Sequence, residues 1–387
     1  MAKQTRKTSS RKTPAKKTTK RPNGKASNSN ASNDVHEVPS SLSVSVSFDT
    51  YPSGAYSHTD LGLSEDQVLA MYRNMLLQRR FEERAAQMYG KQKIAGFLHL
   101  YIGQEAISTG TASALEIGKD SVITAYRDHG HGLALGMTAR EGMAEMFGKV
   151  GGCSRGKGGS MHFFSKEKGL FGGHGIVGAH VPVGVGIAFA HKYKESGGVA
   201  VAFYGDGAVG QGSIHEALNL ASLYELPVIM VVENNQYAMG TPIHRAFAET
   251  EFASHSVAYN MKGAVVDGMD VFSVYKAMQD HVALARENKP SLLEIRTYRY
   301  RGHSMSDPQK YRTKEELEAK KDEDPLVRLK IYILDNDITS GEALDGIDDD
   351  VKQEVLAAVE FAENSPAPEL SEIYDNVYEE TDYPFIS

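Results

Sequence analysis

The chain has 387 residues, of which 41% are hydrophobic and 24% charged, with a formal net charge of −8. This content supports a large apolar core in one or two domains, and no apolar run reaches the roughly 20 residues of a transmembrane helix, so we expect no membrane association. Cys153 is the only cysteine, which excludes an intrachain disulfide and a cysteine-based metal cluster and favours a reducing compartment.

The first 60 residues differ in composition from the rest of the chain. Residues 1–33 contain ten Lys and Arg and neither Asp nor Glu, which leaves a charge of −18 on the remainder. Large apolar side chains are rare before Val44, so we expect residues 1–60 to form a disordered basic tail. A nucleic-acid-binding or organelle-targeting arm is the alternative, but we favour a solvated tail with no nucleic-acid partner. Alternating apolar residues over 42–48 indicate a short strand or a docking arm.

The same end of the chain indicates where the protein resides. It lacks the apolar core of a secretory signal and the amphipathic Leu/Arg pattern of a mitochondrial presequence. We therefore expect a cytoplasmic protein, with the mitochondrial matrix as the alternative.

Two folded regions are expected after the tail. Ser64 and Gln67 have the spacing of a capping box, and apolar residues then recur at helical spacing until Gly90, which ends the predicted helix. Alternation of strand and helix patterns predicts an α/β domain over 61–335. Charged helical segments follow, so residues 336–387 are expected to form an acidic, helical C-terminal extension.

Three stretches in the first half carry side chains suited to a binding site. His99 lies in the string FLHLYIGQE, although a single histidine is more often structural than catalytic. Tyr126 and Arg127 precede a glycine-rich turn. A guanidinium group is well suited to bind phosphate oxygens with two hydrogen bonds, and an ordinary surface turn is the alternative. Residues 148–178 are dense in glycine, which permits either a loop that follows a ligand closely or a flexible surface loop.

The middle of the chain contains the clearest structural unit. Two apolar runs, 199–204 and 228–232, are typical of strands buried on both faces of a parallel sheet. Between them lie the turn that contains Asp206 and a helical pattern over 213–224. The carboxyl ends of parallel strands meet at one edge of a sheet, where ligands bind. We therefore expect Asp206 and Asn235, which follow the two strands, to be neighbours.

Asp206 and Asn235 together predict a magnesium and diphosphate site. Mg2+ prefers hard oxygen ligands in octahedral geometry and commonly shares them with phosphate groups. The Asp206 carboxylate, the Asn235 amide and one nearby backbone carbonyl would supply half of the coordination shell. Free N–H groups at the start of the following helix would face the phosphates. For the short Gly-Asp-Gly motif alone, a turn without a ligand is the alternative.

A longer string extends this motif. GDGAVGQGSIHEALNLASLYELPVIMVVENNQYAMGTP, at 205–242, resembles the thiamine diphosphate motif, which runs from Gly-Asp-Gly to a double Asn. Over about residues 60–335, the sequence is similar to the alpha chains of the thiamine-dependent first component of pyruvate dehydrogenase complexes. Strand and helix patterns continue to alternate over 264–295, which predicts a doubly wound, mostly parallel sheet. The resemblance implies the thiamine-diphosphate-binding form of that fold.

The resemblance also implies roles for individual residues. His99 and His303, the latter in the string YRGHSMSDP, would position the substrate and transfer protons. The ligands of Mg2+ would be Asp206, Asn235 and the carbonyl of Tyr237. Thiamine diphosphate would be bound by Tyr126, Arg127, Gly175, Val177, Asp206, Gly207, Ala208, Asn235 and His303.

One catalytic group of the family has no counterpart in this chain. In the family, a Glu on a second domain touches the aminopyrimidine ring of the cofactor, and this chain has no room for a second complete α/β sheet. Glu105 and Glu233 are candidate substitutes, but neither matches that Glu. The resemblance therefore implies an α2β2 heterotetramer, with the active site shared between this chain and a beta subunit.

The activity implied is oxidative decarboxylation of pyruvate, with transfer of the acetyl group to a lipoyl group and formation of acetyl-CoA in the full complex. The implied partners are the beta subunit, pyruvate, and the lipoyl domain and core of dihydrolipoamide acetyltransferase. One alternative is the alpha subunit of a branched-chain 2-oxoacid or acetoin dehydrogenase. Another is a non-catalytic cofactor-binding scaffold, which the presence of Asp206, Asn235, His99 and His303 disfavours.

Overall fold

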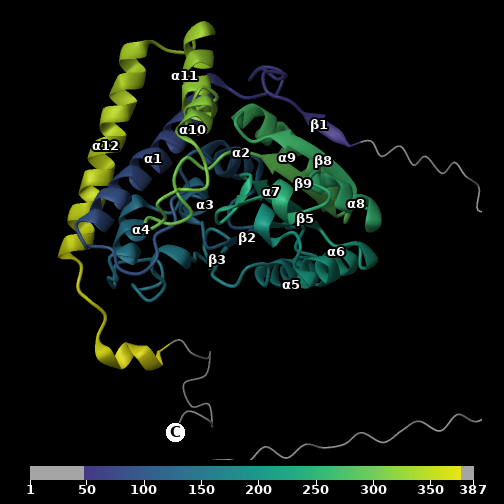
Figure 1. Ribbon diagram of the computed structural model, residues 1–387, viewed down its shortest axis with the longest axis horizontal. Helices are drawn as coiled ribbons and strands as arrows, with labels where there is room; N and C mark the ends of the chain where they lie inside the picture. The colour runs from purple at the N-terminus through teal and green to yellow at the C-terminus, as the bar shows by residue number, and fades with distance from the viewer. Residues whose placement is uncertain (1–47, 376–387) are drawn as a thin grey trace, which may run out of the picture. The chain divides into compact units, whose positions relative to one another are not determined.

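A seven-stranded sheet with the order β1-β8-β9-β5-β4-β2-β3 forms the centre of the fold (Figure 1). The computed structural model describes residues 48–375, which belong to one compact unit. Every neighbouring pair in this sheet is parallel, so the predicted α/β class is confirmed and the sheet is parallel throughout. The strands are β1 (Asp49–Tyr51), β2 (Ser121–Ala125), β3 (Leu170–His174), β4 (Ala200–Gly205), β5 (Val228–Asn234), β8 (Lys262–Asp267) and β9 (Ser291–Arg296), with β6 (Tyr237–Ala238) and β7 (Thr241–Pro242) as a separate antiparallel pair.

Helices connect and cover these strands. The first begins as predicted, because the Ser64 side chain accepts from the Gln67 N–H and the Gln67 side chain accepts from the Ser64 N–H, and it includes Gly90 as its last residue. The α-helices of the described part are α1 (Glu65–Gly90), α2 (Glu105–Ala114), α3 (His129–Ala134), α4 (Ala139–Met146), α5 (His180–Tyr193), α6 (Gly212–Leu223), α7 (Ile243–Ala246), α8 (His255–Ala258), α9 (Val271–Arg286), α10 (Lys314–Lys321), α11 (Pro325–Asp335) and α12 (Gly341–Asn364).

The folded part starts earlier than the sequence pattern indicated. Residues 49–51 form β1, which pairs in parallel with β8 at one edge of the sheet, and the Tyr51 hydroxyl donates to Asp280 at 3.0 Å. The predicted boundary of the tail at residue 60 is therefore too late. Three residues are too short a run to show strand periodicity, and β1 is stabilised by its long-range pairing. Residues 1–47, with most of the alternating stretch at 42–48, lie outside the described residues.

The central strands are buried on both faces, as predicted. In β4, Val201 and Phe203 pack into one apolar core, while Ala202 and Tyr204 pack into a second core on the opposite face. Helices α5 and α6 cover the second face (Figure 1). The absence of a side chain at Gly184 allows α5 to lie close to the sheet. A Cβ atom at this position would lie only 2.9 Å from the Cβ of Ala202.

Helical segments cover the other face and complete the fold. Figure 1 shows α12 lying along α1, and α12 also packs against α4. In the expected C-terminal extension, α12 packs on the α/β part and a 3-10 helix follows at Leu370–Tyr374, while residues 376–387 lie outside the described range. None of the helices between residues 48 and 375 is long and apolar enough to span a membrane.

Candidate active site at the carboxyl edge of the sheet

The ends of β4 and β5 meet at a cavity of about 300 Å3, which we name the inner cavity. Gly205 at the end of β4 pairs with Glu233 of β5, so the residues that follow the two strands leave the sheet side by side. Asp206 and Asn235 both line this cavity, and both are buried. The parallel arrangement therefore brings these two residues together as the sequence predicted.

Asp206 is a buried carboxylate that lacks a partner for one of its oxygens. Its side chain begins a turn of 3-10 helix after β4, and its Oδ2 atom receives no hydrogen bond from the described residues. Burial raises the pKa of Asp206 to about 6. The Arg299 and Arg127 guanidinium groups offset only part of the cost of burying this carboxylate, and a bound cation would offset more of it.

Asn235 and Tyr237 each direct an oxygen atom toward the guanidinium group of Arg299. Nη1 of Arg299 lies 3.4 Å from Oδ1 of Asn235 and 3.3 Å from the carbonyl oxygen of Tyr237. The second nitrogen of the same guanidinium donates to the carbonyl of Met239 at 3.0 Å. Two of the three oxygens expected to bind magnesium thus already face a positive group.

Two buried guanidinium groups line the inner cavity without a carboxylate partner. Arg127 donates to the carbonyl oxygens of Leu100 at 2.5 Å and His303 at 2.8 Å, and neither Arg127 nor Arg299 forms an ion pair within residues 48–375. Burial and the nearby Arg299 lower the pKa of Arg127 to about 10. Two buried cations without an acidic partner favour an anionic ligand.

His99, Tyr126 and His303 form an aromatic cluster beside the inner cavity. The ring centroid of His99 lies 4.6 Å from that of Tyr126 and 5.1 Å from that of His303. Burial and the Arg127 guanidinium lower the pKa of His99 to about 3 and that of His303 to about 4. Both imidazoles are therefore neutral near pH 7, and the Nδ1 atom of each is buried without a hydrogen-bond partner in the described part of the chain.

A second cavity of about 620 Å3, which we name the outer cavity, adjoins the inner one through shared lining residues, among them Tyr126 and His303. His99 and Gly175 line only the outer cavity, while Gly207 and Ala208 line only the inner one. Val177 lines both. The two cavities therefore collect every residue that the resemblance assigned to catalysis, cofactor binding or metal binding.

Three buried polar residues that line the inner cavity were given no role in the sequence-based assignment. Gln104, His180 and Arg299 line the inner cavity, and all three are buried. Gln104 was present in the string FLHLYIGQE, and Arg299 immediately precedes YRGHSMSDP, so proximity to these motifs was the available signal. His180 had no comparable signal, because it follows the glycine-rich loop as a lone histidine.

The two glutamates considered as substitutes for the missing base are already engaged. Glu105 binds Arg79 through both carboxylate oxygens, at 2.5 and 3.1 Å. Glu233 accepts from the Tyr101 hydroxyl at 2.5 Å and lies 3.1 Å from Nε2 of His131. Their hydrogen bonds are typical of structural carboxylates.

The inner cavity fits a magnesium-bound diphosphate. It offers an unpartnered carboxylate oxygen, an amide oxygen and a carbonyl oxygen for the metal. It also offers two guanidinium groups for phosphate oxygens. The adjoining outer cavity has an apolar lining that includes Phe97, Val177 and Met239, which suits the ring system of a cofactor.

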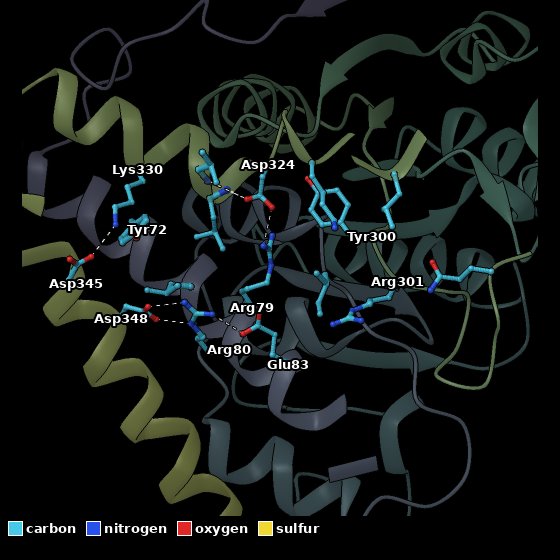
Figure 2. A pocket seen from close by; sticks show the side chains of 17 residues that line it. Tyr72, Arg79, Arg80, Glu83, Tyr300, Arg301, Asp324, Lys330, Asp345 and Asp348 are labelled. Carbon is cyan, nitrogen blue, oxygen red and sulfur yellow. Dashed lines mark hydrogen bonds and ion pairs between the residues drawn. The ribbon is translucent and has the colours of Figure 1, made fainter. Parts of the chain in front are cut away.

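Another cavity, also of about 620 Å3, has a different character. It lies between α1 and the helices α11 and α12, and we name it the charged cavity (Figure 2). Its main ion pairs join Arg80 to Asp348 at 2.7 Å and Lys330 to Asp345 at 3.1 Å. Because these charges neutralise one another, the charged cavity does not resemble a site for a strongly charged ligand.

Comparison with known proteins agrees with this site. The family model described as "Dehydrogenase E1 component" matches residues 73–371. "Pyruvate dehydrogenase E1 component subunit alpha" of Rhizobium meliloti is 51% identical over 81% of this chain and 90% of that protein. The Zymomonas mobilis protein of the same name is 50% identical over 81% and 88%. The chloroplastic subunit alpha-3 of Arabidopsis thaliana is 43% identical over 83% and 77%. The chain belongs to the dehydrogenase E1 component family.

Proposed function

We propose that this chain is the alpha subunit of a pyruvate dehydrogenase that depends on thiamine diphosphate and Mg2+. The observation that carries the proposal lies at the ends of β4 and β5, where the buried Oδ2 atom of Asp206 has no partner within residues 48–375 and shares the inner cavity with two guanidinium groups that form no ion pair within the same range. The relatives named above, with identities of 43% to 51%, favour pyruvate as the 2-oxoacid.

The residues of the inner cavity would hold the diphosphate end of the cofactor. Asp206, Asn235 and the carbonyl of Tyr237 would bind Mg2+, and Arg127 would bind phosphate oxygens beside Tyr126. When bound, thiamine diphosphate supplies an electron sink for the carbon–carbon bond that breaks as a 2-oxoacid loses carbon dioxide. Val177 and Gly175, which line the outer cavity, would contact its ring system.

His99 and His303 would act on the substrate. Both are neutral near pH 7 because burial and Arg127 disfavour their protonated forms. A neutral imidazole accepts a proton at one ring nitrogen and donates from the other, so each can orient a substrate oxygen and move a proton. The Nδ1 atoms of both rings have no partner within residues 48–375, which leaves that capacity available.

The site would be completed by a beta subunit in an α2β2 heterotetramer, because Glu105 and Glu233 are engaged in other contacts. The acetyl group would then pass to the lipoyl domain of dihydrolipoamide acetyltransferase.

We expect the chain to reside in the cytoplasm, and we expect the basic residues 1–33 to have no nucleic-acid partner.

The test is to assay this chain with its beta subunit against pyruvate, branched-chain 2-oxoacids and acetoin, using an artificial electron acceptor. We expect magnesium-dependent turnover that is highest with pyruvate. The chain without the beta subunit should be inactive. Turnover by the isolated chain would contradict the shared site, and a preference for another substrate would contradict the assignment to pyruvate.

A further inference from the structure

Gln104 lies beside the proposed metal ligand Asn235 and makes no other side-chain hydrogen bond within residues 48–375. It is 1% exposed and lines the inner cavity. Its Oε1 atom accepts from Nδ2 of Asn235 at 3.2 Å, while its own Nε2 is buried and has no partner among the described residues. We propose that Gln104 is a positioning residue that orients the amide of Asn235 for magnesium binding. The inference rests on the function proposed above.

The orientation of the Asn235 amide decides whether it can bind a metal ion. Its oxygen is a metal ligand and its nitrogen is not, so a rotated amide would turn a donor toward the cation. On one side, the Tyr237 N–H and Arg299 approach Oδ1, each at 3.4 Å. On the other side, Oε1 of Gln104 accepts from Nδ2. The contact with Gln104 therefore stabilises the orientation that presents oxygen to the metal.

The backbone around Gln104 is held in place from several sides. Gln104 is the N-cap residue of α2, and the next residue, Glu105, is ion-paired with Arg79. Gly103 has a φ of +102°, and a Cβ there would lie 2.4 Å from the carbonyl oxygen of Tyr298. Only glycine fits that close approach. The Gln104 side chain thus starts from a rigid position, as accurate orientation of a ligand requires.

A second buried glutamine shows what a purely structural role looks like. Gln78 donates from Nε2 to Asn74 at 2.8 Å and to Thr109 at 2.9 Å, and its Oε1 accepts from Ser108 at 2.8 Å. Every polar atom of that side chain is engaged within the α1–α2 interface. Gln104 differs because its one hydrogen bond goes to a proposed magnesium ligand, which makes Gln78 a matched control.

The test measures binding rather than turnover. In the enzyme assembled with its beta subunit, thiamine diphosphate binding is titrated by calorimetry at increasing Mg2+ concentration. Gln104→Met removes the acceptor while nearly preserving the volume, and we expect the Mg2+ concentration for half-maximal binding to rise about 10- to 100-fold. Gln104→Glu keeps an acceptor at the same place and should remain within about threefold of wild type. Gln78→Leu should lower the melting temperature without changing the magnesium requirement.

A double variant isolates the orientation effect. Asp at position 235 needs no orientation, because both of its oxygens can bind a metal ion. In the Asn235→Asp background, Gln104→Met should therefore change the magnesium requirement by less than about threefold. An unchanged magnesium requirement in Gln104→Met, or an equal loss in both backgrounds, would overturn the inference. Failure of the wild-type enzyme to bind thiamine diphosphate with Mg2+ would instead overturn the proposed function.

Discussion

The inner cavity and the charged cavity are both lined by Arg and Asp side chains, yet their charges are used in different ways. In the charged cavity, Arg80 binds Asp348 at 2.7 and 2.8 Å, and Arg79 binds Asp324 at 3.0 Å (Figure 2). In the inner cavity, Arg127 has no carboxylate partner within residues 48–375, and Oδ2 of Asp206 has no partner there either.

The difference shows that the pairing of the buried charges in a cavity indicates function better than the volume of the cavity does. The charged cavity has a volume of about 620 Å3 and the inner cavity one of about 300 Å3, but the ion pairs of the charged cavity join α1 to the N-cap residue of α11 and to α12. Unpaired buried charge is costly in the ligand-free protein, so its presence indicates a ligand that compensates for it. The following predictions separate the two kinds of cavity.

The largest effect is expected for Asp206→Asn, measured as pyruvate turnover by the assembled enzyme. Removal of the charge of this proposed metal ligand should lower turnover by about a thousandfold or more and abolish magnesium-dependent cofactor binding. Arg80→Gln, in the charged cavity, is the control and should leave turnover within about twofold. Near-wild-type turnover by Asp206→Asn would show that the unpaired carboxylate is not a metal ligand.

In the charged cavity, the effect should be on stability. Arg79→Met leaves the buried carboxylate of Glu105 without its counter-charge, so the free energy of unfolding should fall by about 3–5 kcal/mol. Arg73 is the matched control, because it lies on α1 like Arg79 and also forms an ion pair. Its partner is Glu354, and this pair is exposed to solvent. Arg73→Ala should cost no more than about 1 kcal/mol in chemical denaturation. Equal losses for the two variants would contradict the distinction drawn from burial.

The pH dependence of stability should reveal the unpaired carboxylate directly. The pKa of Asp206 is about 6 in the folded protein against an ordinary value of 3.8, so the folded state binds the proton more tightly. Its contribution to stability is present below pH 3.8 and is lost as the pH rises through 6. Without cofactor, Asp206→Asn should therefore gain about 3 kcal/mol on wild type between pH 4 and 7. Parallel stability curves for the two proteins, followed by chemical denaturation, would contradict this.

The smallest effect is expected from removal of the basic residues 1–33. Deletion of residues 2–33 should leave turnover with pyruvate and an artificial electron acceptor unchanged. It should at most weaken assembly into a larger complex. A large fall in turnover would show that this segment contributes to the active site.

The sequence was informative where local pattern determines position. The runs at 199–204 and 228–232 predicted two parallel strands, and that topology alone placed Asp206 beside Asn235. The sequence was uninformative where the position of a residue depends on pairing with residues far away in the chain. The strand β3, with the sequence LFGGH, contains two glycines, which disfavour strands, and it is defined by its pairing with β2. Gln104 contacts Asn235 across 131 residues, a separation that no local pattern reports.

The most direct test of the account is the location of the metal ion in crystals of the assembled enzyme. Mn2+ can replace Mg2+ in the presence of thiamine diphosphate, and its anomalous scattering identifies its position. The account predicts a peak within about 2.2 Å of an Asp206 carboxylate oxygen, Oδ1 of Asn235 and the carbonyl oxygen of Tyr237. A peak in the charged cavity beside Asp345 or Asp348, with none beside Asp206, would contradict it.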